Sequence, residues 1–257
     1  MPTVTVREIA LHYESSGAGT PALCLVHGSG GSTEAWRPQL DGLAGTTRVI
    51  ALDLPAHGRS GGDGFASVDE AASIVREFVD ALGIGPVVIG GHSMGGAIAQ
   101  AFALAAPELT AGVVLVGTGA RLRVLPKIFE LIEHDHAAAV AFITDMGVAA
   151  RASEPLRRAI AGQTQRTPPR ILAGDFGACD RFDVSARLGE IRAPALVICG
   201  EEDRLTPPKY AAFLQARLPN ARLVTVPGAG HYVQLEQPDA VTRALVDFLT
   251  SLPVTRA

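Results

Sequence analysis

The sequence predicts an α/β fold in which helices cover both faces of a mostly parallel β-sheet. The first observation behind this prediction is a series of short, continuous apolar runs, which are typical of strands buried on both faces. The second is the helical pattern between these runs, because parallel strands are joined by crossover helices. The third is a long stretch without any strand-like run, which adds a helical insertion to the sheet.

The elements of the first part of the chain follow from local patterns. Ser67 and Glu70 form an S-x-x-E capping box, and apolar residues then recur at helical spacing until Gly83 ends the helix. Alternating runs near the N-terminus predict two antiparallel edge strands. The predicted elements before residue 87 are these edge strands around 4–6 and 9–13, buried strands at 22–26 and 48–52, and helices over 33–43 and 68–82.

The segment from Val87 to Ala106 organises the rest of the chain. It begins with an apolar strand, turns sharply at the pentapeptide G-H-S-M-G centred on Ser93, and continues as a helix. In a G-x-S-x-G turn of this kind the serine occupies a strained position that lifts its hydroxyl clear of the sheet. Glycines flank it because side chains there would collide with the neighbouring strand and with the helix. The N-terminus of that helix points the positive end of its dipole at a place where an anion can form.

The second half resumes the sheet after the insertion. The run at 113–117 is a buried strand, and the helical, proline-broken stretch that follows is interpreted as a cap over the carboxyl edge of the sheet. We therefore divide the chain into a core of residues 1–119 and 188–257 and a cap insertion of residues 120–187. The later predicted elements are strands at 195–199 and 222–226, a helix over 208–217 and a last helix that begins near Pro238.

The composition excludes several classes of protein. The chain has 257 residues, of which 47% are hydrophobic and 19% are charged, as in one large globular domain. A net charge of −4 and the absence of a basic run argue against a nucleic-acid partner. No apolar run reaches the roughly 18 residues that a membrane span requires, and the N-terminal residues lack the pattern of a secretory signal. We therefore expect a cytoplasmic monomer or homodimer without a membrane partner.

Four polar residues follow the predicted carboxyl ends of buried strands: Ser29, Ser93, Asp203 and His231. Ligands of open parallel sheets bind beyond those ends, so we expect these side chains to lie close together. Serine needs a base to remove its proton, histidine can be that base, and a carboxylate can hold the imidazole in the required tautomer. Glu201 and Glu202 lie in the same turn as Asp203 and compete with it for the carboxylate role.

Five short segments carry a family resemblance: His27-Gly28, the loop from Asp53 to Ser60, Gly91–Gly96, Gly200–Asp203 and Gly230-His231. With these motifs the chain resembles the α/β-hydrolase family over nearly its whole length, and above all its small bacterial esterases, enol-lactonases and C–C bond hydrolases with a helical cap. The resemblance implies that Ser93 is the nucleophile, His231 the general base and Asp203 the acid that orients it. It also implies an oxyanion hole built from the backbone N–H groups of Ser29 and Met94, with Gly30 as the alternative to Ser29.

The function expected from these residues is that of a serine carboxylesterase, which cleaves a small carboxylic ester through an acyl-enzyme and needs no cofactor. The alternatives are an enol-lactonase or C–C bond hydrolase of the same fold, or a ligand-binding receptor. The substrate's acyl group is expected to lie under the cap, in a pocket that includes Trp36, Leu125, Phe129, Phe142 and Phe176.

No metal site is expected. His134 and His136 are two positions apart, so on a helix they point to different faces. Cys24 and Cys199 fall inside predicted buried strands and are interpreted as small apolar residues. The remaining histidines near the motifs have structural interpretations: His57 ties loops together, as does His27, and His92 fills the variable position before the serine.

Overall fold

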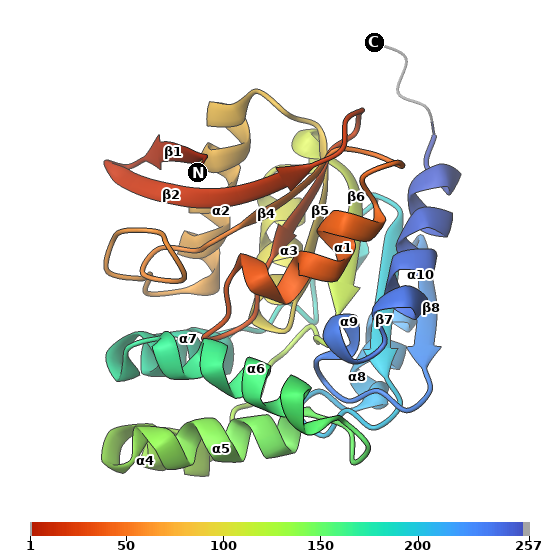
Figure 1. Cartoon of the computed structure of the whole chain (residues 1–257). Helices are drawn as coiled ribbons and strands as arrows, with labels where there is room; N and C mark the ends of the chain where they lie inside the picture. Colours follow the sequence, from red (N-terminus) through yellow and green to blue (C-terminus); the bar gives the residue numbers. More distant parts are fainter. Residues whose placement is uncertain (1, 254–257) are drawn as a thin grey trace.

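The computed structural model describes residues 2–253, and its centre is an eight-stranded sheet with the order β1-β2-β4-β3-β5-β6-β7-β8 (Figure 1). The β1–β2 and β2–β4 pairs are antiparallel, and all other neighbours are parallel. The predicted α/β fold with antiparallel edge strands is therefore confirmed. The strands are β1 (Thr3–Val6), β2 (Ile9–Ser16), β3 (Leu23–Val26), β4 (Val49–Leu52), β5 (Val87–His92), β6 (Thr110–Val116), β7 (Ala195–Gly200) and β8 (Ala221–Val226).

Two hydrophobic clusters lie on opposite faces of the sheet. Successive side chains of a strand point to opposite faces, so Cys24 and Val26 of β3 enter one cluster while Leu23 and Leu25 enter the other. The first cluster is covered by α2 (Val68–Leu82), α3 (Met94–Ala105) and α8 (Pro208–Arg217). The second is covered by η1 (Thr33–Trp36), α1 (Arg37–Gly42), α9 (Val233–Glu236) and α10 (Pro238–Ser251). Burial on both faces explains why the parallel strands are continuous apolar runs.

Helix α2 forms as its sequence predicts. The Ser67 hydroxyl accepts a hydrogen bond from the Glu70 N–H at 3.1 Å, and the Glu70 carboxylate accepts from the Ala66 N–H at 2.7 Å. A serine cap of this kind contributes about 1 kcal/mol to helix stability. Gly83 ends the helix with a φ of 61°, in the left-handed region that favours glycine.

Four α-helices and the short 3-10 helix η3 (Leu188–Glu190) separate β6 from β7. We call the four α-helices the inserted helices: α4 (Pro126–His134), α5 (His136–Gly147), α6 (Glu154–Arg166) and α7 (Pro169–Arg181). They form a layer below the sheet in Figure 1, beyond the carboxyl ends of the parallel strands. Residues from α4, α5 and α7 share a small hydrophobic cluster of their own. Arg121 and Asp183, which flank the inserted helices, form an isolated β-bridge and a 3.3 Å ion pair. The two ends of the inserted segment therefore lie next to each other, where the chain leaves the core and returns to it.

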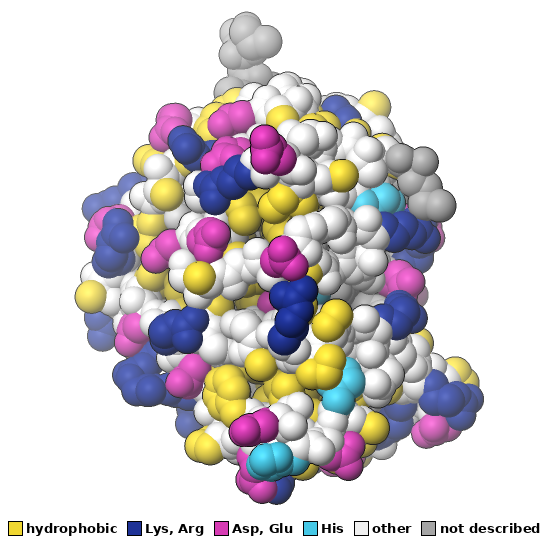
Figure 2. Space-filling model, turned by 90° about the vertical axis from the view of Figure 1, so that its left-hand side faces the viewer, with side chains coloured by type: hydrophobic (Ala, Val, Ile, Leu, Met, Phe, Trp, Pro, Cys, Tyr) yellow, Lys and Arg dark blue, Asp and Glu magenta, His cyan; other side chains and the backbone are white. Residues whose placement is uncertain are grey.

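The surface shown in Figure 2 carries acidic and basic side chains that are interspersed. Several of these charges form exposed ion pairs, such as Arg7 with Glu77 at 2.6 Å and Arg170 with Asp63 at 2.9 Å. Within residues 2–253, no helix is both long enough and apolar enough to cross a membrane. The expected cytoplasmic location, the absence of a nucleic-acid partner and the oligomeric state stay predictions.

Candidate active site

Ser93 lies at the sharp turn between β5 and α3. Its backbone has φ of 54° and ψ of −116°, a strained conformation for a residue with a side chain, and such strain concentrates at functional sites. The flanking glycines are required by close contacts. A Cβ at Gly91 would lie 2.1 Å from the Gly95 carbonyl oxygen, and one at Gly95 would lie 2.2 Å from the Val26 carbonyl oxygen. The turn therefore admits no side chain at positions 91 and 95, two residues before and two after Ser93.

Asp203 and His231 meet beyond the ends of β7 and β8. The His231 Nδ1–H donates to Asp203 Oδ2 at 2.9 Å, and both residues are only 3% exposed. Asp203 also accepts from the Thr206 hydroxyl at 2.8 Å and from the backbone N–H groups of Leu205 and Thr206 at 2.9 and 2.8 Å. This arrangement leaves His231 Nε2 without a partner in the described part of the chain.

These contacts keep Asp203 ionised. Burial raises the pKa of the Asp203 carboxyl, but the His231 ring and the hydrogen bonds from Thr206 outweigh burial, and the pKa lies below its ordinary value. An ionised carboxylate at Nδ1 holds the imidazole in the tautomer whose Nε2 can accept a proton.

His92 and a carbonyl of the inserted helices hold the His231 backbone. The His92 Nε2–H donates to the His231 carbonyl oxygen at 2.9 Å, and the His231 N–H donates to the carbonyl oxygen of Gly147, at the end of α5, at 2.6 Å. Burial, reinforced by the neighbouring His231, lowers the pKa of His92 to about 3, so His92 is a neutral donor. The sequence interpretation of His92 as a variable residue missed this positioning contact.

The backbone N–H groups of Ser29, after β3, and of Met94, the first residue of α3, have no acceptor in the described part of the chain. The Gly30 N–H, by contrast, donates to Asp175 Oδ2 at 2.9 Å. Because Gly30 already has a partner, the geometry favours Ser29 over Gly30 as a donor to an oxyanion. The oxyanion hole of Ser29 and Met94 stays a prediction.

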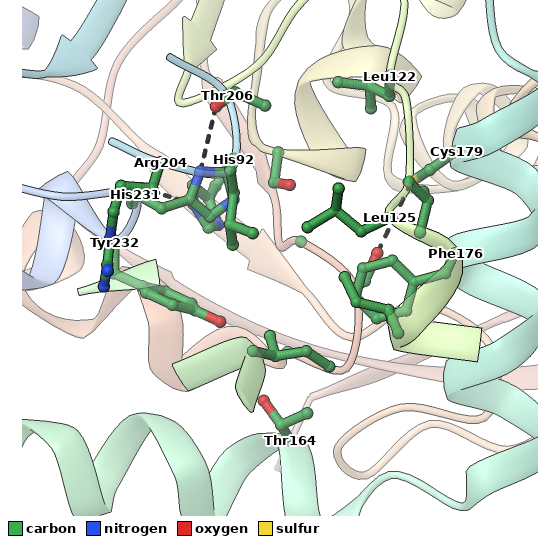
Figure 3. Close-up of a pocket in the computed structure, with 18 of the residues that line it drawn as sticks. His92, Leu122, Leu125, Thr164, Phe176, Cys179, Arg204, Thr206, His231 and Tyr232 are labelled. Carbon is green, nitrogen blue, oxygen red and sulfur yellow. Dashed lines mark hydrogen bonds between the residues drawn. The ribbon is translucent and has the colours of Figure 1, made fainter. Parts of the chain in front are cut away.

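A cavity of about 260 Å³ joins these groups. Ser29, Ser93 and His231 line it from the core, and Leu125, Ile128 and Phe176 line it from the insertion. Figure 3 shows His92 and His231 on one side of the cavity and Phe176 on the other. This small, mostly apolar cavity suits a small ligand.

The structure corrects three of the five predicted pocket residues. Among the described residues, Leu125 and Phe176 line the cavity, whereas Trp36, Phe129 and Phe142 do not. Trp36 is fully buried in the core cluster beneath α1 and α10. Phe142 packs against the cluster of the inserted helices, and Phe129 is half-buried on α4.

The direction in which each helix faces explains the corrections at Phe129 and Phe142. Ile128 and Ile143, each one position away from the predicted phenylalanines, face the cavity instead. A shift of one residue rotates a side chain by about 100° around a helix. The sequence of the insertion does not reveal which of two adjacent apolar residues faces the cavity.

The histidines of the insertion are separated by the junction of two helices. His134 is the last residue of α4 and His136 is the first of α5. Within residues 2–253, no group of three or more histidine, cysteine, aspartate or glutamate side chains is placed to hold a metal ion. Cys24, Cys179 and Cys199 are buried and free. The expectation that the protein needs no cofactor or metal stays a prediction.

Comparison with known proteins agrees with this architecture. A model of the alpha/beta hydrolase family matches residues 25–244. A 2-hydroxy-6-oxo-6-phenylhexa-2,4-dienoate hydrolase from Burkholderia cepacia is 31% identical over 96% of this chain and 96% of its own length. The structure of a thermophilic esterase is 36% identical, with a TM-score of 0.87 over 97% of this chain and 96% of that one. The enol-lactonase from Burkholderia xenovorans is 26% identical, with a TM-score of 0.91 over 97% of this chain and 100% of that one. Because the family model spans most of the sequence and the fold agrees with it, the chain belongs to the alpha/beta hydrolase family.

Proposed function

We propose that this hydrolase is a serine-dependent carboxylesterase with Ser93 as nucleophile, His231 as general base and Asp203 as the acid that orients it. The observation that carries the proposal is the Asp203–His231 hydrogen bond of 2.9 Å, which leaves Nε2 without a partner among residues 2–253 and in the same cavity that Ser93 lines. A serine nucleophile, a histidine base and a carboxylate that orients the base are the groups that ester hydrolysis by a catalytic triad uses. The similarity to a thermophilic esterase supports the same chemistry.

In the first half of the reaction, Ser93 Oγ attacks the ester carbonyl carbon and its proton moves to His231 Nε2. The N–H groups of Ser29 and Met94 donate to the oxyanion of the tetrahedral intermediate, and the N-terminus of α3 adds its positive dipole. His231 then returns the proton to the departing alcohol, which leaves an acyl-enzyme. In the second half, His231 takes a proton from water, the resulting hydroxyl attacks the acyl carbon, and Ser93 is released with its proton restored.

The inserted helices supply much of the apolar wall of the cavity, and we infer that residues 120–187 act as a cap domain. Leu125, Ile128, Ile143 and Phe176 come from this segment and line the cavity together with the core residues. A wall of this kind accepts the hydrocarbon part of an ester and excludes water from the reacting carbonyl.

A panel of p-nitrophenyl esters tests the proposed activity. We expect acetate and butyrate esters to turn over at about 1 s⁻¹ or faster, as ordinary enzymes do. Esters with long acyl chains should react more slowly, because a cavity of about 260 Å³ does not hold them. The Ser93→Ala protein is the control for background hydrolysis. Short esters that react no faster with wild type than with this control would contradict the proposal.

A second candidate is hydrolysis of a C–C bond in an anionic dienoate. The cavity is lined by Arg123 and Lys209, and no carboxylate belongs to its described lining. A third cation of the lining, Arg204, pairs with Asp145 at 3.9 Å. Arg123 and Lys209 form no ion pair with an acid in the described part of the chain, so both are available to a substrate carboxylate. The relative from Burkholderia cepacia is named for a dienoate substrate. A phenyl-substituted dienoate that reacts with a higher kcat/KM than any ester of the panel would favour this candidate over the carboxylesterase.

A further inference from the structure

The loop after β3 is held in place by helix α7 and by the short link between α6 and α7. The Gly30 N–H donates to Asp175 Oδ2 on α7 at 2.9 Å, and the Gly30 carbonyl oxygen accepts from the Thr167 hydroxyl at 3.2 Å. Gly30 has a φ of +64°, and a Cβ there would lie 2.8 Å from Leu172 Cδ1 on α7. Both polar groups of the Gly30 backbone are thus bound by residues that the core itself does not supply.

Asp175 has a second buried partner, His57, in the loop after β4. The His57 Nε2–H donates to the same Asp175 Oδ2 at 2.9 Å, and the His57 Nδ1–H donates to the Pro55 carbonyl oxygen at 3.0 Å. Both ring nitrogens face acceptors, an arrangement that suits the doubly protonated imidazolium. Asp175 is 2% exposed and His57 is 1% exposed. An ion pair so deeply buried contributes little net stability, because both charges have lost their hydration. Separating the two partners would leave an unpaired buried charge, which is costly, so the pair holds both side chains in place.

We propose that Asp175 is a positioning residue for the oxyanion hole: its carboxylate, held by His57, fixes Gly30 and thereby the adjacent Ser29 N–H. This inference rests on the proposed function, in which that N–H binds the oxyanion. An oxyanion donor must lie about 2.7–3.1 Å from the developing charge. Displacement of a catalytic group by about 1 Å costs roughly 100-fold in rate. The inserted helices therefore act on catalysis as well as on the shape of the cavity.

The test is the Asp175→Asn variant, which keeps the shape of the side chain but removes its charge. Both Gly30 and His57 donate to Oδ2, so the amide oxygen can take its place, but as a neutral acceptor it binds the Gly30 N–H and the protonated His57 less strongly. We expect kcat on p-nitrophenyl butyrate to fall by about 10- to 100-fold while KM stays within about threefold of wild type. Asp180→Asn is the matched control on the same helix, because Asp180 binds the Val124 N–H at 3.1 Å and contacts neither Gly30 nor His57. Its kcat should be that of wild type.

Inhibition by butylboronic acid separates positioning from a merely structural role. Boron accepts the Ser93 Oγ lone pair while the serine proton moves to His231, and the resulting tetrahedral anion places an oxygen in the oxyanion hole. The inhibition constant in Asp175→Asn should therefore rise by the same factor by which kcat/KM falls, as expected for an interaction made in the transition state. A loss that appears only in KM, or unchanged kcat and boronic acid affinity in a folded Asp175→Asn protein, would overturn the proposal.

Thr167→Val gives a second, milder test that does not place an uncompensated charge in the core. It removes the hydroxyl that donates to the Gly30 carbonyl oxygen, and we expect kcat and boronic acid affinity to fall together by about threefold or more. If Asp175→Asn does not fold, wild-type values for both quantities in Thr167→Val would overturn the proposal. If Ser93→Ala is as active as wild type, the proposed function itself fails. Loss of activity in Ser93→Ala with full activity in Asp175→Asn removes only the positioning role.

The buried His57–Asp175 pair also predicts how the difference in stability between wild type and Asp175→Asn depends on pH. The charged or titratable groups that face the His57 ring are Asp175 from α7, Asp53 from the loop after β4 and His27 from the loop after β3. Burial lowers the pKa of His57, but Asp175, with smaller help from Asp53, raises it above its ordinary value. A raised histidine pKa adds stability that is present below the unfolded pKa and is lost as the pH rises through the folded pKa.

We therefore expect the urea midpoint of wild type to exceed that of Asp175→Asn by more at about pH 5.5 than at about pH 8.5. In the variant, burial acts on His57 without the opposing carboxylate, so the protonated ring is disfavoured and the folded state loses stability at low pH. A difference that is equal at the two pH values, or larger at the higher one, would contradict a charged His57 paired with Asp175.

Discussion

Ser93→Ala is expected to give a folded protein whose kcat is lower by about 10⁶, because a nucleophile and its base act as one unit. Alanine keeps the Cβ of serine, so the strained backbone at φ of 54° experiences the same steric environment in both proteins. The loss can therefore be assigned to the missing hydroxyl. Steady-state rates on p-nitrophenyl acetate, together with thermal unfolding of both proteins, measure the effect.

Two outcomes would remove Ser93 from the mechanism. One is a variant that keeps more than about a tenth of the wild-type rate. The other is failure of an organophosphonate to label Ser93 in the wild-type protein. A ligand-binding receptor makes a different prediction, namely tight binding of its ligand by Ser93→Ala and only one slow turnover by wild type.

Asp203→Asn is expected to lose about 10⁴ in kcat and to keep its fold. The contacts of Asp203 determine how the amide orients. The backbone N–H groups of Leu205 and Thr206 donate to Oδ1, so the single oxygen of asparagine belongs there. The amide NH₂ then faces His231 Nδ1 in place of Oδ2. An amide N–H donor at Nδ1 forces the ring proton onto Nε2, which can no longer accept the proton of Ser93.

Glu201→Gln and Glu202→Gln are the matched controls for this variant. Both side chains are exposed in the turn that holds Asp203. Among the described residues, the Glu202 carboxylate accepts one hydrogen bond, from the Ala150 N–H at 3.2 Å. We expect both glutamine variants to retain kcat within about twofold of wild type, as surface substitutions do. A loss in either variant as large as that of Asp203→Asn would mean that the wrong carboxylate has been assigned.

The fold could be predicted from the sequence because its determinants are local. Doubly buried strands are continuous apolar runs, and α2 carries its own start and stop signals in Ser67 and Gly83. The meeting of Asp203 with His231 could also be predicted, since the carboxyl ends of parallel strands share one edge of the sheet. Local pattern and topology were sufficient for these features.

Contacts between distant segments could not be predicted in this way. Gly30 and Asp175 are 145 positions apart, and His92 and His231 are 139 apart. Neither pair has a local signal, because an aspartate within a helix and a histidine before a serine suit many environments. The pocket predictions failed at Phe129 and Phe142 for a related reason: the orientation of the inserted helices depends on packing against the core, and helical spacing alone does not specify it.

The Gly147 carbonyl and the Asp175 carboxylate have a consequence for the evolution and redesign of this enzyme. Replacing the insertion as a block would bring a new cavity wall, but it would also remove the acceptor for the His231 N–H and the acceptor for the Gly30 N–H. Chimaeras that exchange the whole segment should therefore lose turnover before they gain a new specificity. Variation at cavity-facing positions such as Ile128 and Ile143 leaves both anchors in place, and it offers the route by which substrate preference can diverge while the chemistry is retained.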